Sequence, residues 1–123
     1  MLRYITFLLL CCVTLTHAED MASVEFRKIN YLIAAIESLP DAQFIRNNTA
    51  YDAKSAADHL RLKWKNAGAK VVTADDFIRL CGSVSSMSGK PYQIRYSDGQ
   101  VITSAAFLRE KLARYVDKPT SNY

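Results

Sequence analysis

The segment PYQIRYSDGQVITSAAFLREKL, residues 91–112, contains a change of hydrophobic periodicity. Apolar and polar residues alternate from Tyr92 to Tyr96, which is typical of a strand with one buried face. Asp98-Gly99 is a tight-turn dipeptide, and Val101-Ile102 follows it as a return strand. From Thr103 or Ser104 onward the apolar residues recur at helical spacing. This segment therefore predicts a β-hairpin followed directly by the last helix.

The first helix is predicted over roughly residues 23–39. Apolar residues repeat there every three or four positions, which is the spacing of an amphipathic helix. Asp20 or Ser23 is placed to cap its start, and Pro40 ends the pattern.

A second helix is predicted after a short connection. Residues 43–46 form an extended piece that leads into the polar turn Asn47-Asn48. Thr49 and Asp52 have the spacing of a capping box. We therefore expect the second helix to run from Ala50 to about Asn66.

Thr73 and Asp76 repeat this start signal for a short third helix around residues 77–81. The fold class that follows is α+β: a small, helix-dominated single domain of about four helices, with one β-hairpin before the last helix. The apolar residues expected to share one core are Phe26, Ile29, Ile33, Ile36, Phe44, Leu60, Trp64, Phe77, Leu108 and Leu112.

Residues 1–18, MLRYITFLLLCCVTLTHA, have the order of a secretory signal peptide. The basic Arg3 precedes an apolar run from Ile5 to Leu15, and the small residue Ala18 ends the segment. This run is shorter than the roughly 20 apolar residues that a transmembrane helix needs. We expect cleavage after Ala18, no membrane insertion of the mature protein, and a single compact domain over residues 19–123.

The mature chain offers little for metal or redox chemistry. Two of the three cysteines leave with the signal, so Cys81 has no partner for an internal disulfide and is expected to be buried. His59 is the remaining histidine, and no cluster has metal-ligand spacing. Removing Arg3 lowers the formal charge of +4 by one. This excess is too small to indicate nucleic-acid binding, and we expect neither a metal nor another cofactor.

The loop SVSSMSGK, residues 83–90, is rich in serine and ends in Gly89-Lys90. Its spacing is not that of a nucleotide-binding P-loop, and Pro91 disfavours a helix start directly after Lys90. Hydroxyl and backbone N–H groups beside the charge of Lys90 suit a small anion. In the other interpretation, the serines cap neighbouring backbone and Pro91-Tyr92 begins a strand.

The predicted second helix carries basic residues on both flanks of its apolar stripe. His59 and Lys63, four residues apart, share one flank, whereas Arg61 lies on the other. These side chains are suited to a basic rim around a groove. Alternatively, their apolar stems cover the edge of the core while their charges stay in water.

Several segments resemble, in the same order, the YfeK-like family of short exported bacterial proteins, a domain of unknown function. The matching segments are FIRN at 44–47, Tyr51, HLRLK at 59–63, TADDFI at 73–78 and SSMSGKPYQI at 85–94. The resemblance implies a bacterial source and a periplasmic location, but no reaction or ligand. The chain departs from the family pattern at Asn48, where glycine is common, and at Cys81.

The preferred hypothesis is a non-enzymatic periplasmic binding or interaction module, whose partner is a small anionic ligand or another periplasmic protein. Its polar, basic surface combines the second helix with the serine-rich loop, and the candidate ligand-binding residues are Arg46, His59, Arg61, Lys63, Ser86, Ser88, Lys90 and Tyr92. The alternative is a small hydrolase or transferase in which His59 is the general base and Ser86 or Ser88 the nucleophile. A third hypothesis is a purely structural role for these motifs, with Arg46 bonding loop carbonyls.

Overall fold

The computed structural model of the protein describes the backbone of residues 13–118 and the side chains of residues 21–118. Helices and strands follow one another along the chain as α1 (Val13–Glu37), β1 (Gln43–Arg46), β2 (Thr49–Tyr51), α2 (Ala53–Ala67), the 3-10 turn η1 (Gly68–Lys70), α3 (Ala74–Cys81), β3 (Gln93–Arg95), β4 (Val101–Thr103) and α4 (Ser104–Ala113).

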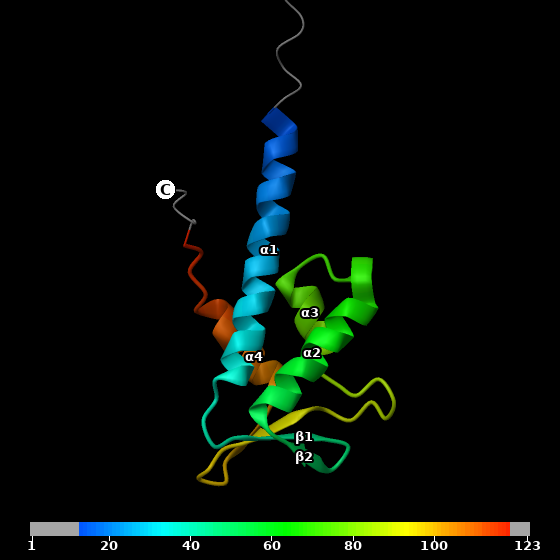
Figure 1. The fold of residues 1–123 in the computed structure, drawn as a ribbon, viewed down its shortest axis with the longest axis vertical. Coiled ribbons are helices and arrows are strands. Elements are labelled where there is room, and N and C mark those ends of the chain that lie inside the picture. The colour runs from blue at the N-terminus through cyan, green and yellow to red at the C-terminus, as the bar shows by residue number, and fades with distance from the viewer. Residues whose placement is uncertain (1–12, 119–123) are drawn as a thin grey trace, which may run out of the picture.

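The strands form one antiparallel sheet in the order β2-β1-β3-β4. Hairpins join β1 to β2 and β3 to β4, and the central pair β1–β3 connects two hairpins that are far apart in the sequence. The helices lie together on one side of this sheet, with α1 extending well beyond it (Figure 1). One face of the sheet is therefore covered by helices.

The core lies between the helices and the covered face of the sheet. All four helices contribute fully buried side chains, and the largest of these are Leu32, Ile33, Ile36, Phe77, Ile78 and Leu108. The sheet adds Phe44 of β1 and Ile94 of β3, which are paired in register across the two strands. Burying a side chain of this size contributes about 1.5–3 kcal/mol relative to leaving it exposed.

The predicted fold class, a small helix-dominated α+β domain, is confirmed. The hairpin before the last helix is present as β3–β4, and Ile94 pairs with Ile102 in its register. Thr73 and Asp76 form the predicted capping box at the start of α3. Thr103 caps α4 by accepting a hydrogen bond from the backbone N–H of Ala106.

The start of the second helix was predicted wrongly. Thr49 does not cap a helix but lies in β2, opposite Arg46 of β1. The helix α2 begins after Asp52, whose side chain accepts a hydrogen bond from the backbone N–H of Ser55. Asn47 and Asn48 both have positive φ, 50° and 64°. This is the requirement of a type I′ hairpin turn, so the chain makes a second hairpin before α2 starts.

The first helix also differs from the prediction. Its described part runs from Val13 to Glu37, so Asp20 and Ser23 lie within the helix and do not cap its beginning. Phe26 was expected in the core but is 59% exposed, although it lies on the part of α1 that packs beside α2. Its ring lies 5.4 Å from that of Trp64, centroid to centroid, so it contacts the edge of the core only.

Residues 1–12 of the expected signal peptide lie outside the described residues, and residues 13–18 form the first part of α1. Among the residues that the structure describes, no helix combines the length and the apolar character needed to cross a membrane.

Candidate functional site

The register of the sheet places two of the candidate residues side by side. Ile45 of β1 pairs with Gln93 of β3, so the next position along brings Arg46 opposite Tyr92. The backbone of Tyr92 is fixed on both sides, because its N–H donates to Ser83 and its carbonyl accepts from Ser104. The side chains of Arg46 and Tyr92 therefore project from a rigid part of the sheet toward the helices.

The helix α2 adds His59 and Lys63, which are four residues apart and lie on the same flank. The Tyr92 hydroxyl oxygen accepts a hydrogen bond from Lys63 Nζ at 3.0 Å and lies 3.3 Å from His59 Nε2. Lys63 Nζ also lies 5.0 Å from the centre of the Tyr92 ring and donates to the carbonyl of Val84. Tyr92 is thus the point where the sheet, the helix and the serine-rich loop meet.

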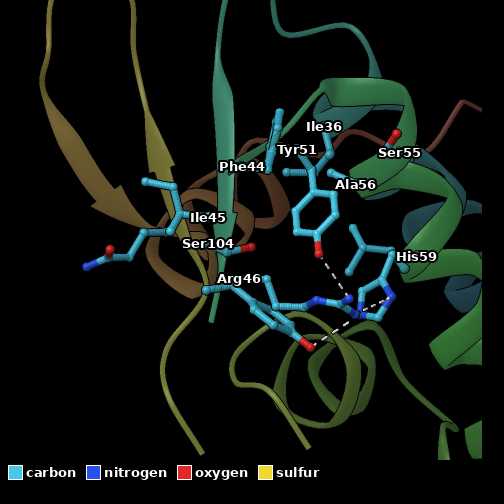
Figure 2. Close-up of a pocket in the computed structure, with 12 residues that line it drawn as sticks. Ile36, Phe44, Ile45, Arg46, Tyr51, Ser55, Ala56, His59 and Ser104 are labelled. Carbon is cyan, nitrogen blue, oxygen red and sulfur yellow. Dashed lines mark hydrogen bonds between the residues drawn. The ribbon is translucent and has the colours of Figure 1, made fainter. Parts of the chain in front are cut away.

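Arg46 completes this cluster from the other side. Its Nη1 lies 3.0 Å from both ring nitrogens of His59, and its Nη2 donates to the Tyr51 hydroxyl oxygen at 3.3 Å. Figure 2 shows Arg46 and His59 pointing toward each other, with the Tyr51 hydroxyl directed at the same place. We call Arg46, Tyr51, His59, Lys63 and Tyr92 the basic cluster.

The basic cluster has more hydrogen-bond donors than acceptors. Arginine and lysine side chains can only donate. With its proton on Nε2, His59 accepts from Arg46 at Nδ1 and donates to the Tyr92 oxygen, which also accepts from Lys63. The hydroxyl hydrogen of Tyr92 and further N–H hydrogens of Arg46 remain available. The cluster is therefore complementary to an acceptor such as an anion.

The positive charge of the basic cluster also makes it complementary to an anion. Burial lowers the pKa of His59 below its ordinary value of 6.5, and the nearby cations Arg46 and Lys63 lower this pKa further. The imidazole is therefore neutral at pH 7. Within residues 21–118, neither Arg46 nor Lys63 forms an ion pair, although both side chains are partly buried. Two positive charges thus share one site without a carboxylate.

A pocket of about 240 Å³ opens beside the basic cluster. Arg46, Tyr51, His59 and Tyr92 line its polar part. Its remaining lining is mainly apolar and comes from α1, β1 and α2, namely Ile36, Phe44, Ile45, Ala56 and Leu60, with Ser55, Gln93 and Ser104 as further polar members. An apolar cavity with a few convergent polar groups is the usual form of a small-molecule site.

The serine-rich loop lies at the edge of this site rather than inside it. Ser85 is buried, and its hydroxyl accepts hydrogen bonds from Asn47 and from the backbone N–H groups of Met87 and Ser88. The Ser88 hydroxyl donates to the side-chain oxygen of Asn47. These contacts tie the loop to the turn between β1 and β2. Ser86 is exposed.

Of the eight candidate residues, the structure brings four together: Arg46, His59, Lys63 and Tyr92. Arg61 is not with them, since it forms ion pairs with Glu37 and with Asp58 on another side of α2. Ser86, Ser88 and Lys90 do not line the pocket. No hydrogen bond within residues 21–118 joins His59 to Ser86 or Ser88.

One residue of the site and two residues at its edge were missed. Tyr51 was placed on the second helix but lies on β2, paired with Phe44 of β1. Asn47 was read only as a turn residue, and Ser85 was not separated from its neighbouring serines. The signal that points to Tyr51 and Asn47 is the Asn47-Asn48 dipeptide, since recognising it as a hairpin turn puts Tyr51 back beside β1.

Cys81 is fully buried at the end of α3, as predicted. Burial raises the pKa of its thiol, so the thiolate needed for nucleophilic attack is disfavoured. Within the described part of the chain, no three histidine, cysteine or acidic side chains are grouped so that they could hold a metal ion.

A family model described as a family of unknown function (DUF5329) matches residues 23–116. The uncharacterized protein YfeK of Salmonella typhimurium strain LT2 is 37% identical over 79 residues, which cover 64% of this chain and 66% of that protein. The chain therefore spans slightly less than two thirds of that relative's length. No solved structure matches.

Proposed function

The chain belongs to the DUF5329 family, whose function is unknown, and we propose that this member is a binding module for a small anionic ligand. The observation that carries the proposal is that two cations, Arg46 in the pocket lining and Lys63 bonded to Tyr92 of that lining, converge here without pairing with a carboxylate among the described residues. Arg46 and the Tyr92 hydroxyl line the pocket and contact the anion. Lys63 lies behind Tyr92 and adds its charge.

The contacts of His59 support binding rather than covalent chemistry. His59 makes its contacts to Arg46 and Tyr92, and no described hydroxyl group of the loop is its partner. A general base needs its target proton within hydrogen-bond reach. The same contacts suit a preformed binding site, because each donor already has a fixed direction before the ligand arrives.

The proposal is tested by titrating the protein with acetate and with sulfate at constant ionic strength, followed by amide NMR. We expect shifts centred on residues 46, 51, 59 and 92. Arg46→Gln should weaken binding at least about tenfold, since a hydrogen bond to a charged group is worth about 1.5–3 kcal/mol. Lys63→Gln should weaken it less, because Lys63 acts through Tyr92.

Lys65→Gln is the matched control, because Lys65 is an exposed residue of the same helix and its loss changes the net charge equally. Equal effects of Arg46→Gln and Lys65→Gln would show that only net charge matters, and the proposed site would be wrong. Binding should also weaken as salt rises, since charges are screened over about 8 Å at physiological ionic strength.

We propose a periplasmic location for the protein. The support is the sequence order of residues 1–18, in which Arg3, an apolar run and Ala18 follow one another as in a signal peptide. Mass spectrometry of the protein from a periplasmic extract should find a chain that starts at Glu19. An intact chain that begins at Met1 and stays in the cytoplasm would contradict this location.

A further inference from the structure

The pocket is divided into a charged part and an apolar part. Phe44 lies on the same face of β1 as Arg46, two residues earlier, so the two side chains leave the strand about 7 Å apart. In Figure 2, Ile36, Phe44 and Ala56 lie together on one side of the Tyr51 ring, and Arg46 and His59 lie on the other. A ligand that fills the pocket therefore contacts both parts.

A small inorganic anion would use only the charged part. It would leave the surfaces of Phe44, Ala56 and Leu60 in contact with water. Water molecules form few hydrogen bonds with such an apolar lining. A ligand with an apolar body replaces this water and adds the hydrophobic free energy of burial. The two parts of the pocket thus favour a molecule with two corresponding parts.

We propose that the ligand is an amphipathic monoanion of medium length, such as a straight-chain carboxylate, with its charged group at Arg46 and Tyr92 and its alkyl chain against Phe44, Ala56 and Leu60. This inference rests on the proposed function and names the ligand class for the same site. Arginine is suited to this charged group, because its planar guanidinium can bind both oxygens of a carboxylate.

The volume of the pocket limits the length of the chain. At about 30 Å³ for a water molecule in the liquid, 240 Å³ is equivalent to roughly eight such molecules. A ligand with about this number of non-hydrogen atoms fills the pocket, which is slightly smaller than the ~300–1,000 Å³ of sites for drug-sized ligands. Longer chains would extend into solvent and gain no further burial.

The test is calorimetric titration of the purified protein with acetate, butanoate, hexanoate, octanoate and decanoate at one ionic strength. Affinity should rise about fourfold for each added methylene, which is the effect of burying one such group. The rise should level off near six carbons, because hexanoate has about eight non-hydrogen atoms, six carbons and two oxygens. Octan-1-ol has a similar chain without the charge and should bind at least about tenfold more weakly than octanoate.

A variant that fills the pocket separates this inference from a non-specific effect of chain length. Ala56→Leu places an isobutyl group in the apolar part, whereas Ala113→Leu makes the same change at an exposed position of α4. We expect Ala56→Leu to lower octanoate affinity at least about tenfold and acetate affinity by a much smaller factor. Ala113→Leu should change neither. Thermal melting of both variants controls for folding.

The outcomes distinguish the two proposals. If acetate and octanoate bind equally and Arg46→Gln weakens both, the anion site stands and the amphipathic ligand is wrong. An unchanged octanoate affinity in a folded Ala56→Leu variant also overturns the amphipathic ligand. If no carboxylate binds, or if octan-1-ol binds as tightly as octanoate and Arg46→Gln has no effect, the proposed anion site fails as well.

Discussion

Removing only the hydroxyl group of Tyr92 tests the central contact of the site. The Tyr92 side chain is buried, with 8% of its surface exposed, and its oxygen contacts both Lys63 and His59. Tyr92→Phe keeps the ring in its place between the sheet and α2. The change therefore separates the hydrogen bonds of Tyr92 from its packing.

The two contributions differ in size. A hydrogen bond inside a protein contributes about 0.5–1.5 kcal/mol, and Lys63 keeps its bond to the Val84 carbonyl when the Tyr92 hydroxyl is lost. We expect Tyr92→Phe to lower the free energy of unfolding by about 1 kcal/mol. Tyr92→Ala also removes the buried ring and should cost about 3 kcal/mol. Lys90→Ala, at an exposed position, should cost less than about 0.5 kcal/mol.

Urea denaturation of the three variants measures these differences, and anion titration of the same samples measures binding. Tyr92→Phe should remain folded at 25 °C and should bind at least about tenfold more weakly than the unchanged protein, because the free hydroxyl hydrogen is lost. The reasoning is refuted if Tyr92→Phe is as unstable as Tyr92→Ala, or if it binds anions as well as the unchanged protein does.

Three further predictions concern other parts of the fold. Lowering the pH from 7 to 5 should lower the free energy of unfolding measured by urea denaturation. The reason is that the folded pKa of His59 lies below 6.5, so the unfolded chain binds the proton more readily. His59→Gln should reduce this dependence of the free energy of unfolding on pH. The native thiol of Cys81 should react with a thiol reagent far more slowly than that of the unfolded chain, and equal rates would contradict its burial. Asp52→Ala should lower the free energy of unfolding, followed by thermal melting, by about 1 kcal/mol, which is typical of a lost helix cap. Thr49→Ala should lower it clearly less, and a larger effect of Thr49→Ala would indicate that Thr49 is the cap.

The elements that were predicted correctly are those that depend on nearby residues. The capping box of Thr73 and Asp76 and the Asp98-Gly99 turn involve only contacts within a few positions. The helical stripe of α1 identified Ile29, Ile33 and Ile36 because periodicity alone sets the buried face. These features need no knowledge of the rest of the chain.

The wrong predictions concern features that are determined by distant segments of the chain or by two competing local signals. Thr49 and Asp52 have the spacing of a cap, but the left-handed conformation of Asn47 and Asn48 turns the chain back to pair with β1 first. Phe26 continues the apolar stripe of α1, but it contacts Trp64 only at the edge of the core and stays largely exposed. A periodic pattern shows which face of a helix is apolar, but not how far the covering elements reach.

The candidate site was predicted in part for the same reason. Helical spacing placed His59 and Lys63 together, and it also placed Arg61 on the other flank, where Glu37 and Asp58 pair with it. The approach of Arg46 and Tyr92 depends on the pairing of β1 with β3, which no local pattern in the sequence specifies.

The pairing of β1 with β3 has a consequence for the order of folding. It joins segments about fifty residues apart, as in the pair Phe44–Ile94, and closing so long a loop costs more chain entropy than forming either hairpin alone. Contacts between distant segments are generally made late and slow the overall reaction. Both hairpins and α2 can begin to form while the two halves are still separate. The basic cluster and its pocket, however, come into existence only in the step that joins these halves, so a binding-competent intermediate with an open sheet is not expected.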